Sequence, residues 1–356
     1  MKLILHTAFF IFSLFLMLSR NIAPKYFWPV GMLVQLIPLL WIINIILLLI
    51  MILKKSRFFY FPLFIIIILS IFFFNSTFQL RNTEKSTASN SISVISYNAS
   101  FFKKKTTFSK EYYDPLLNAA ALEINNWLVL NEADVICVQE FFDDVNSDIL
   151  NNIATITASG KYEYHFVYKQ KHDNGIRQGL VIFSKYPIID KGTVFISENN
   201  YNGAIYTDLK IKNDTVRIID VHLESMRLAS KTDYLFTFFR AYKYGVIKHN
   251  IQLEKLMSFI RKTPPQYKII LCGDLNETPY SFVYKQLNEK LNNAFENAGS
   301  GFGFSFNSQS LPLLRIDNQF YDPRLQIQTF KTIEECNASE HFPIVGEYSL
   351  QKKSSE

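Results

Sequence analysis

The segment KIILCGDLN, residues 268–276, indicates the fold class most directly. Its first five residues are mostly apolar and predict a short buried strand. The strand ends in two polar side chains, Asp274 and Asn276, and the pair Thr278-Pro279 then begins a helix. A buried strand that ends in polar residues is typical of proteins that mix strands and helices, whose sites form at strand ends.

The chain from about residue 91 onward repeats this mixture of strands and helices. One helix is predicted after Pro115, and a long aromatic helix, with a possible break at Gly245, over residues 233–260. Two strands flank the polar turn Lys212-Asn213-Asp214, which is a hairpin signal. Many strands with fewer helices predict an α+β fold or a layered sandwich. Further strands are predicted over residues 91–98, 134–140, 161–169, 179–189, 313–320 and 342–350.

Polar side chains of one chemical kind stand at the ends of these strands. They are carboxylates, amides and histidines, and no cysteine is among them. Oxygen ligands of this kind favour Mg²⁺ or Mn²⁺ over zinc, so the pattern predicts a site for a hard cation. The set comprises Asn98, Glu140, His222, Asp274, Asn276, Asp317, Glu340 and His341.

Six segments in order resemble the motifs of the endonuclease/exonuclease/phosphatase superfamily. They are ISYNA (95–99), ICVQE (136–140), DVHLES (220–225), LCGDLNETP (271–279), RIDN (315–318) and SEHFPI (339–344). The resemblance covers a domain of residues 92–350. It implies a DNase I-like four-layer α/β sandwich, in which two sheets pack face to face with helices outside. It also implies hydrolysis of phosphoesters with a divalent metal.

The resemblance implies a role for each matching residue. Glu140 binds the metal, and Asn98 supports the metal or the phosphate. Asp274 and Asn276 orient the attacking water and a phosphoryl oxygen, because a carboxylate can take a proton and an amide can donate a hydrogen bond. Asn276 thereby also contacts the substrate.

The two matching histidines and the carboxylates beside them complete this set. His222 donates to the phosphate or to the leaving oxygen, and so binds substrate. His341 faces the phosphate, and Asp317 orients it and favours its cationic form. The last motif departs from the usual Ser-Asp-His, because Glu340 replaces the aspartate. If Glu340 binds metal, the longer side chain predicts an altered metal preference.

Three long apolar runs precede this domain, over residues 3–18, 27–53 and 58–74. They have no polar face, so we expect three membrane helices in a region of residues 1–75. The alternative for the first run is a signal peptide, although no small-x-small cleavage site follows it. The Ser/Thr-rich segment 76–91 is predicted to be a linker.

The orientation in the membrane depends on short basic loops. Four Lys and Arg residues fall on each side, but KKSR (54–57) is compact and predicts a cytoplasmic loop. The protein is then a multi-pass membrane protein with an extracytoplasmic catalytic domain.

The charge distribution bears on the substrate. The chain has a net charge of +6, but residues 1–90 hold eight Lys and Arg against one Glu, and the rest holds 29 basic and 30 acidic residues. The domain is therefore close to neutral, so the basic net charge of the whole chain is no argument for binding a polyanion. The apolar content of 49% excludes disorder, and three Cys exclude a disulfide scaffold.

We predict a membrane-anchored, divalent-metal-dependent phosphodiesterase or phosphatase. A membrane tether suits a lipid head group or a sugar phosphate, but the sequence leaves the phosphoester substrate open between these and a nucleic acid. A DNA or RNA nuclease is the alternative, for which Lys103, Lys104 and Lys105 would supply a local basic patch. A non-catalytic membrane sensor or adaptor with the same fold is the alternative from another class. No pattern in the sequence predicts the oligomeric state.

Overall fold

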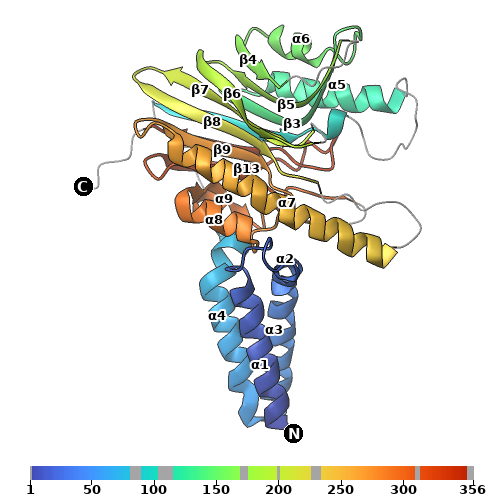
Figure 1. Cartoon of the computed structure of the whole chain (residues 1–356), viewed down its shortest axis with the longest axis vertical. Coiled ribbons are helices and arrows are strands. Elements are labelled where there is room, and N and C mark those ends of the chain that lie inside the picture. Colours follow the sequence, from blue (N-terminus) through green and yellow to red (C-terminus); the bar gives the residue numbers. More distant parts are fainter. Residues whose placement is uncertain are drawn as a thin grey trace. The chain divides into compact units, whose positions relative to one another are not determined.

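The computed structural model describes residues 2–80, 90–102, 115–168, 175–198, 201–225, 234–308 and 313–350 (Figure 1). The chain divides into two compact units. The helical unit comprises Met1–Gln79, Met226–Ile251 and Glu277–Gln286. The sandwich unit comprises Leu80–Ser225, Gln252–Asn276 and Leu287–Glu356. The helical unit thus combines the N-terminal helices with two segments from the second half of the sequence, Met226–Ile251 and Glu277–Gln286.

The apolar N-terminal runs form helices, as predicted. In Figure 1, the helices α1, α3 and α4 lie side by side. Two apolar stretches, Pro29–Leu53 and Arg57–Thr77, are long enough to cross a membrane, and the apolar helix Leu3–Ser19 is shorter. A membrane span by any of these three helices stays a prediction. The elements are α1 (Lys2–Ser19), α2 (Pro29–Leu33), the 3₁₀ turn η1 (Val34–Leu36), α3 (Ile37–Leu53), η2 (Arg57–Phe59) and α4 (Tyr60–Thr77).

Two later helices contribute segments to both units. Helix α7 (Tyr234–Lys262) runs unbroken through Gly245, and its first part, up to Ile251, belongs to the helical unit. Helix α8 (Phe282–Lys290) begins in the helical unit. Most of the predicted linker, residues 81–89, lies outside the described residues.

The sandwich unit contains two six-stranded sheets with helices outside, which confirms the predicted α+β class. The first sheet has the order β10-β12-β9-β8-β7-β6, and the second has the order β13-β14-β2-β3-β5-β4. The first sheet contains β6 (Ile188–Ile196), β7 (Gly203–Ile211), β8 (Asp214–His222), β9 (Lys268–Asp274), β10 (Asn292–Asn293) and β12 (Asp317–Tyr321). The second contains β2 (Ser91–Asn98), β3 (Val135–Asp144), β4 (Tyr164–Val167), β5 (Ile176–Ser184), β13 (Gln326–Thr332) and β14 (Ile344–Ser349). Shorter elements are β1 (Gln79–Leu80), η3 (Ser100–Phe102), α5 (Pro115–Leu130), α6 (Asn152–Thr157), α9 (Ala294–Ala298) and β11 (Ser300–Gly301).

Side chains that alternate between the two faces of each strand pack the sheets against each other and against the outer helices. In β2, Val94 belongs to the core between the sheets, whereas its neighbour Ile95 packs with Ile124 of α5 on the outer face. Successive strand residues point to opposite faces, so a run of apolar residues covers both. On the outer face of the first sheet, Phe259 of α7 packs on Tyr206 of β7. The result is the predicted four-layer α/β sandwich.

The strand register brings the polar strand ends together. Strands β8 and β9 are parallel, and their last residues, His222 and Asp274, are paired. Strand β12 is antiparallel to β9, and its first residue, Asp317, is also paired with Asp274. In the second sheet, Asn98 at the end of β2 is paired with Gln139 of β3. Three candidate side chains therefore form one row at an edge of the first sheet.

Candidate active site

Asp274 is the central residue of this row and is held by two hydrogen bonds. Its Oδ2 atom accepts from the side-chain amide of Asn98 at 3.0 Å, and its Oδ1 atom accepts from the backbone N–H of Asn276 at 2.8 Å. The side chain is buried. Asn276 has a φ of +49°, a conformation that asparagine tolerates better than most residues. The Asp274 carboxylate is therefore fixed before any substrate arrives.

The backbone before Asp274 requires glycine. Gly273 has a φ of +138°, and a Cβ there would stand 1.8 Å from the carbonyl oxygen of Val221 in β8. Only glycine allows so close an approach of the two strands. This contact sets how near the ends of β8 and β9 lie.

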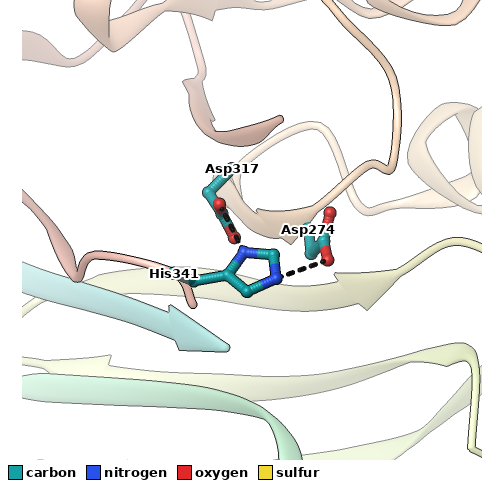
Figure 2. A group of neighbouring side chains, drawn as sticks. All are labelled: Asp274, Asp317 and His341. Carbon is teal, nitrogen blue, oxygen red and sulfur yellow. Dashed lines mark hydrogen bonds and ion pairs between the residues drawn. The ribbon is translucent and has the colours of Figure 1, made fainter. Parts of the chain in front are cut away.

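His341 lies between Asp317 and Asp274, as Figure 2 shows. Its Nδ1 atom is 2.9 Å from Oδ2 of Asp317, and its Nε2 atom is 3.8 Å from Oδ2 of Asp274. Burial lowers the pKa of His341, but the carboxylates of Asp317 and Asp274 outweigh this and raise the pKa to about 9. The imidazole is therefore a buried cation at neutral pH, suited to bind a phosphate oxygen.

His222 is placed to contact a ligand. It is 1% exposed, and neither ring nitrogen makes a hydrogen bond within the described residues. Its Nε2 atom lies 3.6 Å from Oδ2 of Asp274 and 3.7 Å from Oε1 of Glu140. These separations exceed hydrogen-bond length, and a buried imidazole without partners indicates a group that is supplied on binding.

Glu140 reaches this cluster because β3 is irregular at that point. The pairing of β3 with β5 shifts between Val138 and Phe141, and Glu140 has a φ of +46°. A bulge of this kind re-aims a side chain, and such strain concentrates at functional sites. The Glu140 side chain keeps 22% of its surface exposed, so it can bind an ion.

The donor chemistry of the site fits a hard divalent cation. The carboxylates of Glu140 and Asp274 come from β3 and β9, one strand of each sheet, and such oxygen donors suit Mg²⁺ or Mn²⁺. Asp274, Asp317 and His341 also offer ligand atoms within 4.8 Å of one another. In this second group, Nδ1 of His341 and Oδ2 of Asp317 already face each other at 2.9 Å, so the first group is the better candidate for the cation.

Glu340 lies in the loop between β13 and β14, directly before His341. It is half-buried, and its backbone carbonyl accepts a hydrogen bond from the N–H of Asn307 at 2.8 Å. Its assignment as a metal ligand rests on the sequence motif and stays a prediction. The structure thus joins seven of the eight predicted residues by contacts, and it places Glu340 next to one of them.

A buried polar pair beneath the site was missed by sequence reasoning. Gln139 donates from Nε2 to Oδ1 of Asp220 at 2.5 Å, and also to Ser96 at 3.2 Å. Burial raises the pKa of Asp220 to about 8, and the hydrogen bond from Gln139 lowers it only in part. Asp220 is therefore protonated at neutral pH. An aspartate within the apolar strand TVRIIDVHL was the available signal.

Two serines and one aromatic ring contact the candidate site residues. Ser305 donates from Oγ to Oδ2 of Asp317 at 2.8 Å. Ser339 donates to the backbone carbonyl of Asn98 at 2.8 Å, and the ring of Phe306 lies 4.7 Å from that of His341. Serine positions give no distinctive sequence signal, because solvated loops hold many of them.

Solved structures share this fold. An endonuclease/exonuclease/phosphatase from Bacteroides vulgatus is 14% identical, with a TM-score of 0.55, and the match covers 74% of this chain and 100% of that one. Sphingomyelinase C from Streptomyces griseocarneus is 17% identical, with a TM-score of 0.52 and coverage of 73% and 99%. ANGEL2, a 2′,3′-cyclic phosphatase, is 15% identical, with a TM-score of 0.53 and coverage of 74% and 96%. At these identities the likeness shows the fold alone.

Comparisons of sequence point to a family. No curated protein sequence matches the chain. The model of a domain of unknown function matches residues 1–77, and that of the Endonuclease/Exonuclease/phosphatase family matches residues 95–341. This second match spans more than half of the chain and includes every residue of the candidate site. The chain therefore belongs to the endonuclease/exonuclease/phosphatase family, whose members are phosphoester hydrolases.

Proposed function

We propose that the protein is a membrane-anchored phosphodiesterase or phosphatase that depends on a divalent metal. The observation that carries the proposal is one buried carboxylate between two imidazoles. Oδ2 of Asp274 lies 3.6 Å from His222 and 3.8 Å from His341. Asp274 can accept the proton of an attacking water, and the imidazole on each side of it can donate a hydrogen bond to a phosphoryl oxygen.

Asp274 acts as the base in this mechanism. Asn98 and the backbone of Asn276 fix both of its oxygens, so the carboxylate can orient a water and accept its proton. The water attacks phosphorus in line with the leaving oxygen, and no covalent enzyme intermediate is needed. Bound at Glu140, with Asn98 and Glu340, Mg²⁺ or Mn²⁺ would neutralise phosphoryl oxygens.

The histidines stabilise charge that grows on oxygen. His341 carries a proton at neutral pH, because Asp317 and Asp274 raise its pKa to about 9 against the effect of burial. It can donate to an equatorial phosphoryl oxygen from Nε2. His222, whose ring nitrogens have no hydrogen-bond partner among the described residues, can donate to a second oxygen or to the leaving group.

The membrane assignment narrows the substrate class. The apolar stretches Pro29–Leu53 and Arg57–Thr77 support anchoring at a bilayer, where a tethered enzyme meets lipid at high effective concentration. We therefore propose a phosphorylated lipid head group or sugar phosphate as substrate. The basic cluster KKSR (54–57) supports an extracytoplasmic site. The Lys103–Lys105 patch, on which the nuclease alternative depends, lies outside the described residues.

The test uses the full chain in lipid nanodiscs. Phospholipids, sugar and inositol phosphates, RNA and DNA are offered in parallel with Mg²⁺, with Mn²⁺ and with excess chelator. We expect turnover of a lipid or sugar phosphate that chelator abolishes and added metal restores. Turnover of nucleic acid alone would establish the nuclease instead. Turnover that survives chelation would contradict the metal-dependent mechanism.

Orientation is tested separately. A reporter that is active only in the cytoplasm is fused to the C-terminus of the full chain. We expect it to be inactive, and an active reporter would place the catalytic unit in the cytoplasm.

A further inference from the structure

The helical unit includes part of the catalytic loop, by which we mean residues 274–280 at the end of β9. Glu277–Gln286 begins one residue after Asn276. The hydroxyl of Thr278 donates to Oε1 of Gln35 at 2.7 Å, and the hydroxyl of Tyr280 lies 3.1 Å from Oγ1 of Thr77. The loop is therefore bonded by side chains to the N-terminal helices.

Apolar packing accompanies these hydrogen bonds. The ring of Tyr280 meets that of Phe73 edge to face at 5.9 Å. Tyr280 belongs to one buried cluster with Leu16, Ile37 and Leu69, which come from α1, α3 and α4. One residue of the loop thus joins the core of all three apolar helices.

One face of helix α7 contacts residues 25–31, which precede α3 in the helical unit. Tyr242, Val246 and Asn250 are spaced by four residues and so lie on one side of the helix. Tyr242 donates to the carbonyl of Gly31 at 2.6 Å, and Asn250 accepts from the N–H of Lys25 at 3.3 Å. Val246 fills the space over Gly31, where a Cβ would stand 3.0 Å from its Cγ1 atom.

The same helix also contacts Glu277, the first residue of the loop that belongs to the helical unit. Nδ1 of His249 lies 2.7 Å from Oε1 of Glu277, and both side chains are buried. Residues 277, 278 and 280 are therefore tied in turn to α7, to η1 and to the end of α4. A buried pair of this kind is costly to break, because it leaves a buried polar group without its partner.

The catalytic geometry depends on the backbone immediately before this segment. The N–H of Asn276 binds Oδ1 of Asp274 at 2.8 Å, and the side chain of Asn276 donates to the carbonyl of Leu223 at 3.1 Å. Consecutive Cα atoms are about 3.8 Å apart, so Asn276 cannot move independently of Glu277. Displacements as small as about 1 Å at a catalytic group can cost about a hundredfold in rate.

We propose that the N-terminal helices hold the catalytic loop in place, in addition to anchoring the chain. Gln35 and Thr77, through Thr278 and Tyr280, are positioning residues for Asp274 and Asn276. This inference rests on the proposed hydrolase function, and it assigns a role to the matched domain of residues 1–77. If the N-terminal helices only anchor the chain, breaking these contacts should leave kcat unchanged. If they also position Asp274 and Asn276, breaking the contacts should lower kcat.

The test compares two substitutions at Thr278 in the full chain. Thr278→Val keeps the shape but removes the hydroxyl, and Thr278→Ser keeps the hydroxyl. We expect Thr278→Val to speed amide hydrogen exchange in residues 274–280 by about five- to tenfold. We also expect kcat to fall by a similar factor with KM little changed, and Thr278→Ser to restore both. Gln35→Met should reproduce Thr278→Val, and the double variant should lose no more than either single one.

A second pair separates loop support from general loss of stability. Tyr242→Phe removes the bond to Gly31, and the control Tyr162→Phe removes a comparable bond of 3.1 Å to the carbonyl of Ala133 in the sandwich unit. We expect only Tyr242→Phe to speed exchange at residues 274–280. The proposal is overturned if Thr278→Val matches the unaltered protein in exchange and kcat, or if Tyr162→Phe has the same effect as Tyr242→Phe. If the unaltered chain hydrolyses no substrate, the proposed function fails, and exchange alone still decides the inference.

Discussion

The buried acid Asp220 makes the stability of the sandwich unit depend on pH in a calculable way. Burial raises its pKa to about 8, whereas an unfolded aspartate has a pKa of about 3.9. Between these values the folded state holds a proton that the unfolded state has lost. A group with a raised pKa contributes its full stability below pH 3.9, and that contribution is lost as pH rises through about 8.

The perturbation is Asp220→Asn, which keeps the shape and the acceptor for Nε2 of Gln139 but cannot ionise. One pH unit corresponds to about 1.36 kcal/mol for a single proton. The variant should therefore gain about 2.7 kcal/mol relative to the unaltered protein between pH 5 and pH 7. Every other titrating group is common to both proteins and cancels in this difference.

The assay is urea unfolding of the full chain in detergent at pH 5, 6 and 7. Trp127 packs on Tyr97 within the sandwich unit, so Trp28→Phe and Trp41→Phe make its fluorescence specific for that unit. The control is Asp208→Asn, because Asp208 is a buried carboxylate that accepts two hydrogen bonds of 2.6 Å from Arg217.

The control should be destabilised by about 3–5 kcal/mol at every pH, since it leaves the buried Arg217 without its carboxylate. A stability difference between Asp220→Asn and the unaltered protein that is constant from pH 5 to pH 7 would refute the reasoning. It would mean that Asp220 is already ionised in the folded protein at pH 5.

Three further predictions concern the site itself. Asp317→Asn should shift the alkaline fall of kcat from about pH 9 toward neutral pH, because His341 loses the carboxylate that raises its pKa, and an unshifted pH profile would contradict this. Gly273→Ala should destabilise the sandwich unit by more than about 3 kcal/mol in urea unfolding, since the new methyl group meets the Val221 carbonyl, and near-native stability would contradict it. Glu340→Asp should change the ratio of activities with Mg²⁺ and Mn²⁺, and an unchanged ratio would argue against a metal role for this residue.

Much of the fold could be predicted because its strands are strongly patterned. SISVISYN became β2 over the predicted residues, and KIILCGD became β9. The run 179–189 divides between β5 and β6 in different sheets, with Pro187 between them, and apolar content alone does not show such a change of sheet. Strand β13, rich in Gln, Thr and Lys, carried too little apolar signal to be predicted.

The site residues that lie at strand ends within motifs could be predicted from the sequence. The residues that contact them from distant parts of the chain could not. Asp274, Asp317 and His222 follow from motifs that the register then aligns. Gln139 and Asp220 lie in different sheets and 81 residues apart along the chain, so no local sequence pattern predicts their hydrogen bond. Assignment of the segment 277–286 to the helical unit likewise depends on contacts that are about 200 to 240 residues apart along the chain.

The central claim is that the cluster around Asp274 hydrolyses a phosphoester. The most direct measurement is the steady-state rate of the full chain on its best substrate, with Mg²⁺, for Glu140→Ala, Asp274→Asn and His341→Ala. The control is Glu132→Gln, which changes an exposed carboxylate that pairs with Lys161, away from the site. We expect each of the three site variants to lose turnover while remaining folded, and the control to keep it. Full activity in any two of the three site variants would show that this cluster is not the active site.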